Sequence, residues 1–243
     1  MAGHSHWAGI KHKKGRADKE RSKIFSKLSR EITVAAKLGD KDPNMNPRLR
    51  TAIQAAKQAN MPKENISRSI SKSETDNNKN YENLRYEGFG PFNVALIIET
   101  LTDNKNRSAS SIRTILQKNG GRLGETGSIT YLFLNYGIIH IEKDKISEEE
   151  IFELASNSGA EDCLNLDGVH EIVSRKENFY KVRNILEEKF DNLIYSGIEW
   201  RAKTMVNLTG EQNKKIVEII EALEELDDVQ NIFTNASLRA EQE

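Results

Sequence analysis

The apolar pattern of the chain changes once, and this change limits the possible folds more than any other feature. Up to residue 72 the apolar residues recur at helical spacing, whereas from residue 81 short β-branched runs alternate with amphipathic segments. The polar stretch 73–80 (SETDNNKN) has no large apolar side chain and indicates a linker between the two parts. The sequence therefore predicts a small helical domain, residues 1–80, followed by an α+β region.

Three helices are expected in the first part. The longest covers residues 17–38 and ends at Gly39. Asn46 is a cap for the second helix, and Met61-Pro62 opens the third. The apolar stripe of the first helix consists of Ile24, Phe25, Leu28, Ile32 and Ala35.

The second part alternates strands and helices. Strands are expected at 93–101, 128–134, 137–141, 193–200, 203–208 and 229–233, with a strand pair within 163–174. Helices are expected at 107–118, capped by Asn106, and at 147–158, 176–190 and 210–226. The first and last strand-helix-strand units could form one split sheet with helices on one face, although the pattern leaves open how they are joined.

Composition is typical of a cytoplasmic globular protein. The chain has 243 residues, of which 37% are hydrophobic, and this is enough to bury a core. The longest apolar run, 94–98, is far shorter than the roughly 20 residues of a membrane-spanning helix, and no apolar signal core follows the basic N-terminus. The single cysteine, Cys163, fits a reducing compartment. We therefore expect a cytoplasmic location and no membrane partner.

The net charge of −1 conceals a strong asymmetry. Residues 1–72 contain 17 Lys and Arg against 6 Asp and Glu, out of 36 basic and 37 acidic residues in the chain. The remainder therefore has 19 basic and 31 acidic residues, and the two parts carry +11 and −12. A basic N-terminal part of this strength is typical of a segment that binds a polyanion.

The cations of helix 17–38 lie opposite its apolar stripe on a helical wheel. One face can therefore pack in a bundle while the other contacts phosphates, although a solvated charged face would give the same pattern. A basic, glycine-containing arm precedes the helix, and its Trp7 could stack on a base or pack on the bundle. The candidate nucleic-acid-binding residues are Trp7, Lys11, Lys13, Lys14, Arg16, Lys19, Lys23, Lys27, Arg30, Arg48, Arg50, Lys57, Lys63 and Arg68.

Other kinds of site are weaker interpretations. The glycine-rich stretch 120–128 lacks the lysine of a P-loop and follows a helix rather than a strand, so it indicates a turn. The histidines of the arm lack the cysteine or carboxylate set of a structural zinc site. Cys163 and His170 have no orienting third group for nucleophilic catalysis. No cofactor, metal or small-molecule substrate is therefore expected.

A cluster of carboxylates follows residue 220 near the C-terminus. Its members are Glu221, Glu224, Glu225, Asp227 and Asp228. We interpret the cluster as a solvated helix end. The alternative is an acidic surface that contacts a basic protein or repels nucleic acid from the wrong side.

Distinctive short motifs run along the chain. They are Gly3-His4-Ser5 with Trp7, Asp42-Pro43, Asn60-Met61-Pro62, Tyr86-Glu87-Gly88-Phe89-Gly90-Pro91, Leu101-Thr102-Asp103-Asn104 with Asn106-Arg107, and Gly120-Gly121 with Leu123-Gly124. In combination they resemble the bacterial YebC/PmpR family, whose mitochondrial relative is the translational activator of cytochrome c oxidase subunit one. Two departures stand out: His6 replaces the usual lysine, and Phe92-Asn93 replaces a usual glycine, which argues against a tight turn there.

The resemblance implies three domains and a regulatory role. The domains would be 1–80 (helical, with the basic arm), 81–134 plus 204–243 (a discontinuous middle domain), and 135–203 (inserted in the middle one). The last two would be small α/β-sandwich-type, ferredoxin-like domains. Members of this family are described as non-enzymatic regulators, either by binding DNA or by activating translation on the ribosome.

Three functions follow as hypotheses. The first is a transcriptional regulator that binds duplex DNA through its basic N-terminal domain. The alternative is a ribosome-associated translation factor in which the same domain contacts ribosomal RNA. The weakest is a nuclease, because the carboxylates of the basic part are too scattered to hold two metal ions. We therefore expect a non-enzymatic protein whose partner is DNA or, in the alternative, the ribosome.

Overall fold

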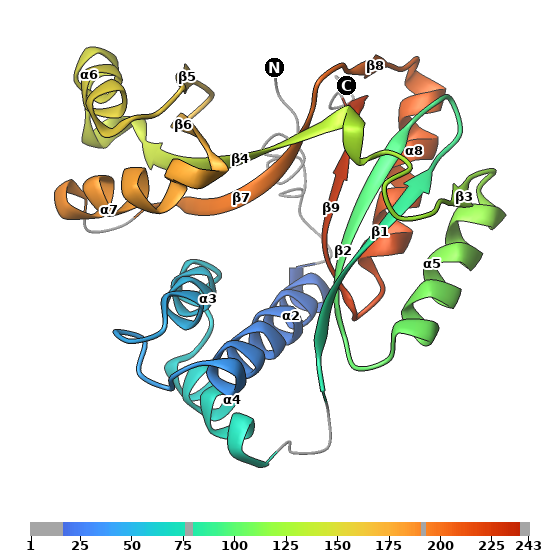
Figure 1. Ribbon diagram of the computed structural model, residues 1–243, viewed down its shortest axis with the longest axis horizontal. Helices are drawn as coiled ribbons and strands as arrows, with labels where there is room; N and C mark the ends of the chain where they lie inside the picture. The colour runs from blue at the N-terminus through green and yellow to red at the C-terminus, as the bar shows by residue number, and fades with distance from the viewer. Residues whose placement is uncertain (1–16, 76–79, 191–192, 239–243) are drawn as a thin grey trace. The chain divides into compact units, whose positions relative to one another are not determined.

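The computed structural model describes residues 17–75, 80–190 and 193–238 (Figure 1). Three helices form the part we call the head: α2 (Ala17–Leu38), α3 (Pro47–Gln58) and α4 (Lys63–Thr75). α2 packs against both of the others, and its Ile32 is buried with Leu49 of α3 and Ile66 of α4. The helix expected at 17–38 is confirmed, although Ile24 of its apolar stripe is 47% exposed.

Asn46 fixes the turn between α2 and α3. Its side-chain oxygen accepts a hydrogen bond from the Leu49 amide (3.1 Å), as expected for an N-cap. Its side-chain nitrogen donates to the backbone oxygens of Ala35 (2.8 Å) and Asp40 (2.6 Å). One buried side chain therefore satisfies polar groups at the end of one helix and at the start of the next.

The expected linker is partly helical. α4 continues to Thr75, so the first residues of the polar stretch belong to the head. Ser73 is buried, and its hydroxyl donates to the backbone oxygen of Ile70 (2.6 Å). A serine that bonds back into its own helix satisfies its polar group there, so a polar sequence can continue the helix. Residues 76–79 lie outside the described part of the chain.

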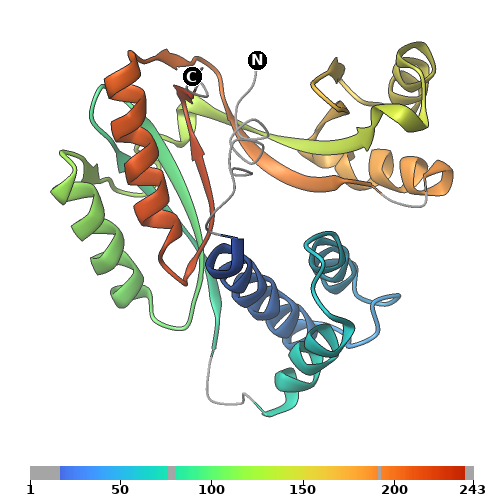
Figure 2. The ribbon, with the colours of Figure 1, turned by 180° about the vertical axis from the view of Figure 1, so that it is seen from behind.

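A four-stranded sheet follows the head, with strand order β3-β1-β2-β9. The strands are β1 (Glu82–Phe89), β2 (Ala95–Thr102), β3 (Arg122–Leu123) and β9 (Val229–Thr234). The helices α5 (Lys105–Lys118) and α8 (Gly210–Glu224) lie side by side against it (Figures 1 and 2). Their apolar residues, among them Leu116 and Leu223, share one core with Leu96 of β2. β8 (Val206–Asn207) and β10 (Ala236–Ser237) form a separate parallel pair.

Glu87 of β1 holds a segment that the sequence predicts to be a strand. Its carboxylate is buried and accepts hydrogen bonds from the amides of Gly127 (2.8 Å), Ile129 (2.8 Å) and Thr130 (3.1 Å), and from the Thr130 hydroxyl (2.6 Å). Amides that bind a carboxylate are not available to a strand ladder. The strand expected at 128–134 is therefore wrong: Thr130–Leu132 is a 3-10 turn and the next strand begins at Phe133.

Residues 134–201 form a second compact unit, inserted between the two parts of the first. Its elements are β4 (Phe133–Glu142), α6 (Glu148–Ser158), β5 (Asp162–Asn165), β6 (Val169–Arg175), α7 (Phe179–Lys189) and β7 (Tyr195–Ala202). The strand order is β5-β6-β4-β7, and Ile139 and Ile172 of the sheet pack against Ile151 and Leu186 of the helices. This succession of elements is the ferredoxin-like one. The predicted fold class, an α+β chain with a helical N-terminal domain and an inserted α/β-sandwich-type domain, is confirmed.

The turn between β1 and β2 is tight, contrary to the expectation from Phe92 and Asn93. Both residues adopt left-handed backbone conformations, with φ of 61° and 62°. The Gly90 amide donates to the Val94 oxygen (2.8 Å), and the Val94 amide donates to the Pro91 oxygen (3.2 Å). A phenylalanine at positive φ is strained, since its Cβ approaches the backbone. The ladder of β1 and β2, paired from Glu82–Thr102 to Phe89–Ala95, imposes this conformation on the turn.

Substitutions at Phe92 should reveal this strain. We expect Phe92→Gly to be more stable than Phe92→Ala by about 1 kcal/mol, because both lose the ring and only alanine keeps the left-handed strain. At an ordinary extended or helical position the order would be reversed. Urea denaturation of the two variants measures the difference, and equal stabilities would contradict the strained turn.

Candidate nucleic-acid interface

The basic stripe of α2 contacts the acidic end of α8 within the same chain. Lys23 forms an ion pair with Glu225, and Lys27 Nζ donates to the backbone oxygen of Glu224 (3.1 Å). Arg30 Nη1 donates to the backbone oxygen of Asp227 (2.7 Å). Helix 17–38 carries four candidate cations: Lys19, Lys23, Lys27 and Arg30. The last three are therefore bound to the end of α8 and the turn that follows it.

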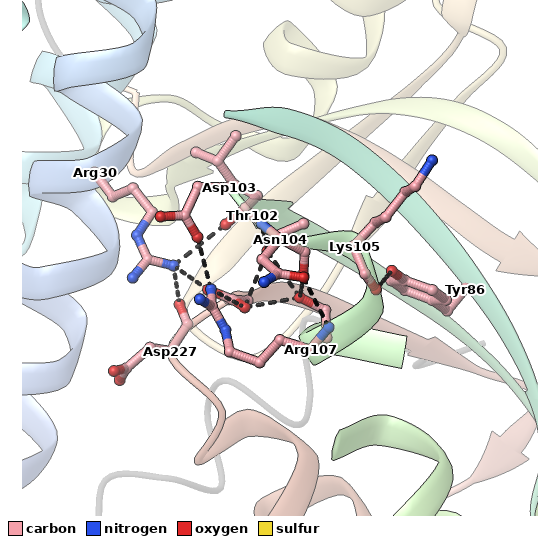
Figure 3. Close-up of polar contacts among 11 residues, drawn as sticks. Arg30, Tyr86, Thr102, Asp103, Asn104, Lys105, Arg107 and Asp227 are labelled. Atoms are coloured by element: carbon pink, nitrogen blue, oxygen red, sulfur yellow. Dashed lines mark hydrogen bonds and ion pairs between the residues drawn. The ribbon is translucent and has the colours of Figure 1, made fainter. Parts of the chain in front are cut away.

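The Asp228 carboxylate joins Arg30 to residues of β2 and α5. Figure 3 shows Arg30, Thr102 and Arg107 of this group. The carboxylate accepts hydrogen bonds from Arg30 Nη1 (2.9 Å) and from Arg107 Nη2 (2.9 and 3.2 Å). Arg30 donates to Oδ1 and Arg107 to both oxygens, and the hydroxyls of Ser108 (2.7 Å) and Thr102 (3.1 Å) donate to Oδ2. Burial alone would raise the pKa of Asp228, but the hydrogen bonds from Ser108, Arg107 and Thr102 outweigh it and hold the pKa below its usual value. The group is therefore a carboxylate with four partners.

The start of α5 places two of these partners. Asn104 caps the helix, accepting from the Arg107 amide (3.0 Å), and its own amide donates to the Thr102 hydroxyl (3.0 Å). The helix thus starts two residues before the expected Arg107, and its cap is Asn104 rather than Asn106. This start turns Arg107 and Ser108 toward Asp228. Figure 3 shows Arg107 with its neighbours Asp103 and Asn104.

A hollow of about 370 Å³ adjoins the Asp228 contacts. Its lining includes both arginines and three carboxylates, together with Tyr81, whose ring lies 5.7 Å from the Arg30 guanidinium carbon. The arginines already face Asp228, and Arg107 also pairs with Asp103 (2.8 Å). The carboxylates therefore neutralise the arginines of the hollow, which makes it a poor binding site for a phosphate.

The remaining candidate residues of the head fall into two groups. Arg48 forms a bidentate ion pair with Glu31 (2.7 and 3.1 Å). Arg50 donates to the backbone oxygen of Pro43 (3.1 Å). By contrast, the side chains of three candidates on α3 and α4 are exposed, and within residues 17–75 they form no ion pair: Lys57, Lys63 and Arg68.

Part of the predicted site lies outside the described residues. Trp7, Lys11, Lys13, Lys14 and Arg16 belong to that part. Lys19 falls within α2, but its side chain is also outside the description. Their role in binding stays a prediction.

The acidic cluster has a structural role that the sequence does not reveal. Glu221, Glu225 and Asp227 are exposed, as expected for a solvated helix end, whereas Asp228 is only 9% exposed. The sequence signal for the contact of this cluster with α2 is the opposite charge of the two segments, one around Lys23 and the other around Glu225. No sequence rule, however, pairs segments about 200 residues apart.

Comparisons with known proteins agree along the chain. A family model described as the TACO1/YebC protein N-terminal domain matches residues 5–76, and one described as the TACO1/YebC second and third domain matches residues 81–236. The chain belongs to the TACO1/YebC family. A relative from Pelagibacter ubique (strain HTCC1062), named probable transcriptional regulatory protein SAR11_0592, is 55% identical over 239 residues, covering 98% of this chain and 99% of that protein.

A solved structure supports the fold of this TACO1/YebC member. The crystal structure of the conserved hypothetical protein Aq1575 from Aquifex aeolicus matches with a TM-score of 0.84 and 43% identity. The match covers 96% of this chain and 97% of that one. The resemblance inferred from the short motifs is thereby confirmed.

The described residues contain neither a metal-binding cluster nor a membrane-spanning helix. Within residues 17–75, 80–190 and 193–238, no three His, Cys, Asp or Glu side chains are grouped so that they could hold a metal ion. The helices in these ranges include none with the length and apolar character needed to span a bilayer.

The inserted unit contains a buried charged cluster of its own. Glu171 of β6 is fully buried and accepts hydrogen bonds from Arg201 (2.7 and 2.8 Å) and from His140 Nε2 (2.9 Å). Glu199 also faces Arg201 (3.2 Å), and the Tyr195 ring lies 5.3 Å from the His140 ring. Burial would raise the pKa of Glu171, but the hydrogen bonds from His140 and Arg201 lower it to about 2.

Replacing Asp228 should weaken the folded state. We expect Asp228→Ala to lower the free energy of unfolding by about 3 kcal/mol, because it leaves Arg30, Ser108 and Thr102 without their common partner. Asp228→Asn, which keeps one acceptor oxygen, should lose less. Urea denaturation measures both. The control is Glu221→Gln on the exposed side of α8, which should change stability by less than about 0.5 kcal/mol.

The low pKa of Glu171 predicts a defined acid sensitivity. A carboxyl with a folded pKa of about 2 and an ordinary unfolded value of 4.5 stabilises the fold above pH 4.5, and this contribution is lost as pH falls toward 2. It amounts to about 3 kcal/mol. Wild type should therefore exceed Glu171→Gln in stability at pH 6, with the gap closing between pH 5 and 2. A gap that does not depend on pH would contradict the carboxylate's role.

Proposed function

We propose that this TACO1/YebC member is a non-enzymatic regulator of transcription that binds duplex DNA through its head. The observation that carries the proposal is family membership with a relative named probable transcriptional regulatory protein that is 55% identical over nearly the whole chain. The basic charge of residues 1–72, +11, supports a polyanionic partner. DNA would be bound in the cytoplasm, without a cofactor.

The uncompensated cations of the head indicate where DNA would bind. Lys57 lies in the last turn of α3, Lys63 begins α4, and Arg68 follows one turn later. Their exposed ends can approach phosphates without breaking a contact within the chain. Lys23, Lys27 and Arg30 would first have to leave the α8–β9 turn. We therefore assign the first contacts to the α3–α4 side of the head, with the basic arm as a second element.

The domain division belongs to the same proposal. We place a helical DNA-binding domain at 1–80, a discontinuous domain at 81–134 plus 204–243, and the inserted domain at 135–203. The compact unit of residues 134–201 begins and ends within two residues of this insertion.

Charge reversal on α3 and α4 tests the DNA surface. Lys57→Glu, Lys63→Glu and Arg68→Glu combined should weaken binding to a DNA duplex and reduce the slope of log K against log salt by up to about 2.7, or 0.9 for each phosphate that is no longer neutralised. Fluorescence anisotropy over a salt series measures the slope. The matched control reverses three exposed lysines on and beside α7 of the inserted unit, Lys176, Lys181 and Lys189, and should leave the slope unchanged.

Two results would contradict the proposal. Equal slopes for the two triple variants would move the binding surface away from the head. Failure of wild type to bind any DNA duplex, with binding to ribosomal RNA retained, would favour the translation factor instead.

A further inference from the structure

One segment of the acidic part of the chain has no acidic residue. Between Asp103 and Glu125, residues 104–124 contain five Lys and Arg and no Asp or Glu. The surrounding part, residues 73–243, carries −12. This segment is essentially α5 with its flanking turns and β3.

α5 buries one face and exposes the other. Ser108, Ile112 and Leu116 are buried and pack toward the sheet and α8. The opposite face is exposed and entirely polar, with no carboxylate: Asn106, Ser110, Arg113, Thr114, Gln117 and Lys118. In both ribbon views α8 lies on one side of α5, and no other described helix of the head or the middle sheet covers its outer face (Figures 1 and 2).

Two of the five cations have partners within the chain, and three remain exposed. Arg107 pairs with Asp228, and the Arg122 guanidinium carbon lies 4.1 Å from the centre of the Phe89 ring. Lys105, Arg113 and Lys118 form no ion pair with any residue that the structure describes, and all three are exposed. Lys105 is the first residue of the helix and lies on the side of the buried Ile112, whereas Arg113 and Lys118 belong to the exposed face.

The neighbouring helix α8 shows that an exposed face with cations and no carboxylate is not general on this surface. α8 packs beside α5 and exposes Lys214 and Lys215, but it also exposes the carboxylates of Glu211, Glu218 and Glu221. Positive charge on α8 therefore has carboxylates beside it on the same helix, whereas Arg113 and Lys118 on the exposed face of α5 have none. At physiological ionic strength the Debye length is about 8 Å, so local compensation decides what each helix attracts.

We propose that the exposed face of α5 is a second nucleic-acid-binding surface, which contacts the DNA backbone through Arg113 and Lys118. This inference rests on the proposed DNA-binding function. The helix is about 21 Å long, at 1.5 Å for each of its 14 residues. At 3.4 Å per base pair, this length spans roughly six base pairs. Amide and hydroxyl groups between the cations can donate to further phosphate oxygens.

An acidic protein is the other conceivable partner, but the chemistry of the face disfavours it. Protein interfaces are anchored by buried aromatic and large apolar side chains, with Arg at their centre. The exposed face of α5 has no such anchor, since its members are cations, amides and hydroxyls. A cationic face without an apolar centre fits a uniformly charged polyanion.

Neutralising the α5 face tests the assignment. Arg113→Gln combined with Lys118→Gln keeps good helix formers and removes two charges. The variant should bind a DNA duplex several-fold more weakly at 0.15 M salt, with the salt slope reduced by up to about 1.8. The matched control is Lys214→Gln with Lys215→Gln, which removes the same charge from α8 and should keep the wild-type slope. Thermal unfolding confirms that both variants are folded.

The outcomes separate the inference from the function on which it rests. A reduced slope for the α5 variant alone supports the second surface. If wild type binds DNA and the two variants behave alike, α5 is not a binding surface, while the proposed function stands. If wild type binds no DNA, both proposals fail. If the α5 variant keeps the wild-type affinity and salt slope for DNA but loses polyglutamate binding that wild type shows, the face is a protein-docking surface instead.

Discussion

A single carboxylate, that of Asp228, connects parts of the chain that are far apart in sequence. Arg30 of the head lies 198 residues away, and Thr102, Arg107 and Ser108 lie between 120 and 126 residues away. All of them donate to the two oxygens of one side chain. A group with this many donors keeps its charge despite its burial, because hydrogen bonds to the charged form stabilise it more than desolvation destabilises it. This ionised group therefore joins Arg30 of α2 to the start of α5, beside the contacts that Lys23 and Lys27 make with Glu225 and Glu224.

Because of these contacts, the charge asymmetry of the chain does not by itself indicate an external partner. Blocks of +11 and −12 are typical of a chain whose basic part meets an external polyanion. In this TACO1/YebC member the two blocks also meet each other, through Lys23, Lys27 and Arg30 on one side and the acidic end of α8 on the other. Some cations of the basic part therefore bind acidic segments of the same chain, although a total of basic residues would assign all of them to an external partner. Exposed cations without an internal partner are a better guide to external binding than total charge.

Local sequence rules predicted the helices well and failed where distant groups decide the conformation. Asn46 acts as the expected cap, and α2 has its expected bounds, because caps and periodicity are encoded within a few residues. β1 was not expected, since its sequence ENLRYEGF is largely polar and gains its strand form from pairing with β2. The Glu87 contacts and the strained Phe92 likewise depend on partners supplied by the folded sheet. The sequence identifies the candidate DNA-binding cations, but it does not show which of them contact other groups within the chain.

The chain leaves the first unit and returns to it at neighbouring residues. β4 begins at Phe133, directly after the segment that Glu87 holds, and β7 ends at Ala202. The Lys203 amide donates to the Leu132 oxygen (2.9 Å), so the outgoing and returning chains are adjacent where they leave the first unit. Joining Leu132 to Lys203 would therefore close the first unit across a single hydrogen bond. The strand order β3-β1-β2-β9 would be left intact by such a deletion, since none of its strands lies between these two residues.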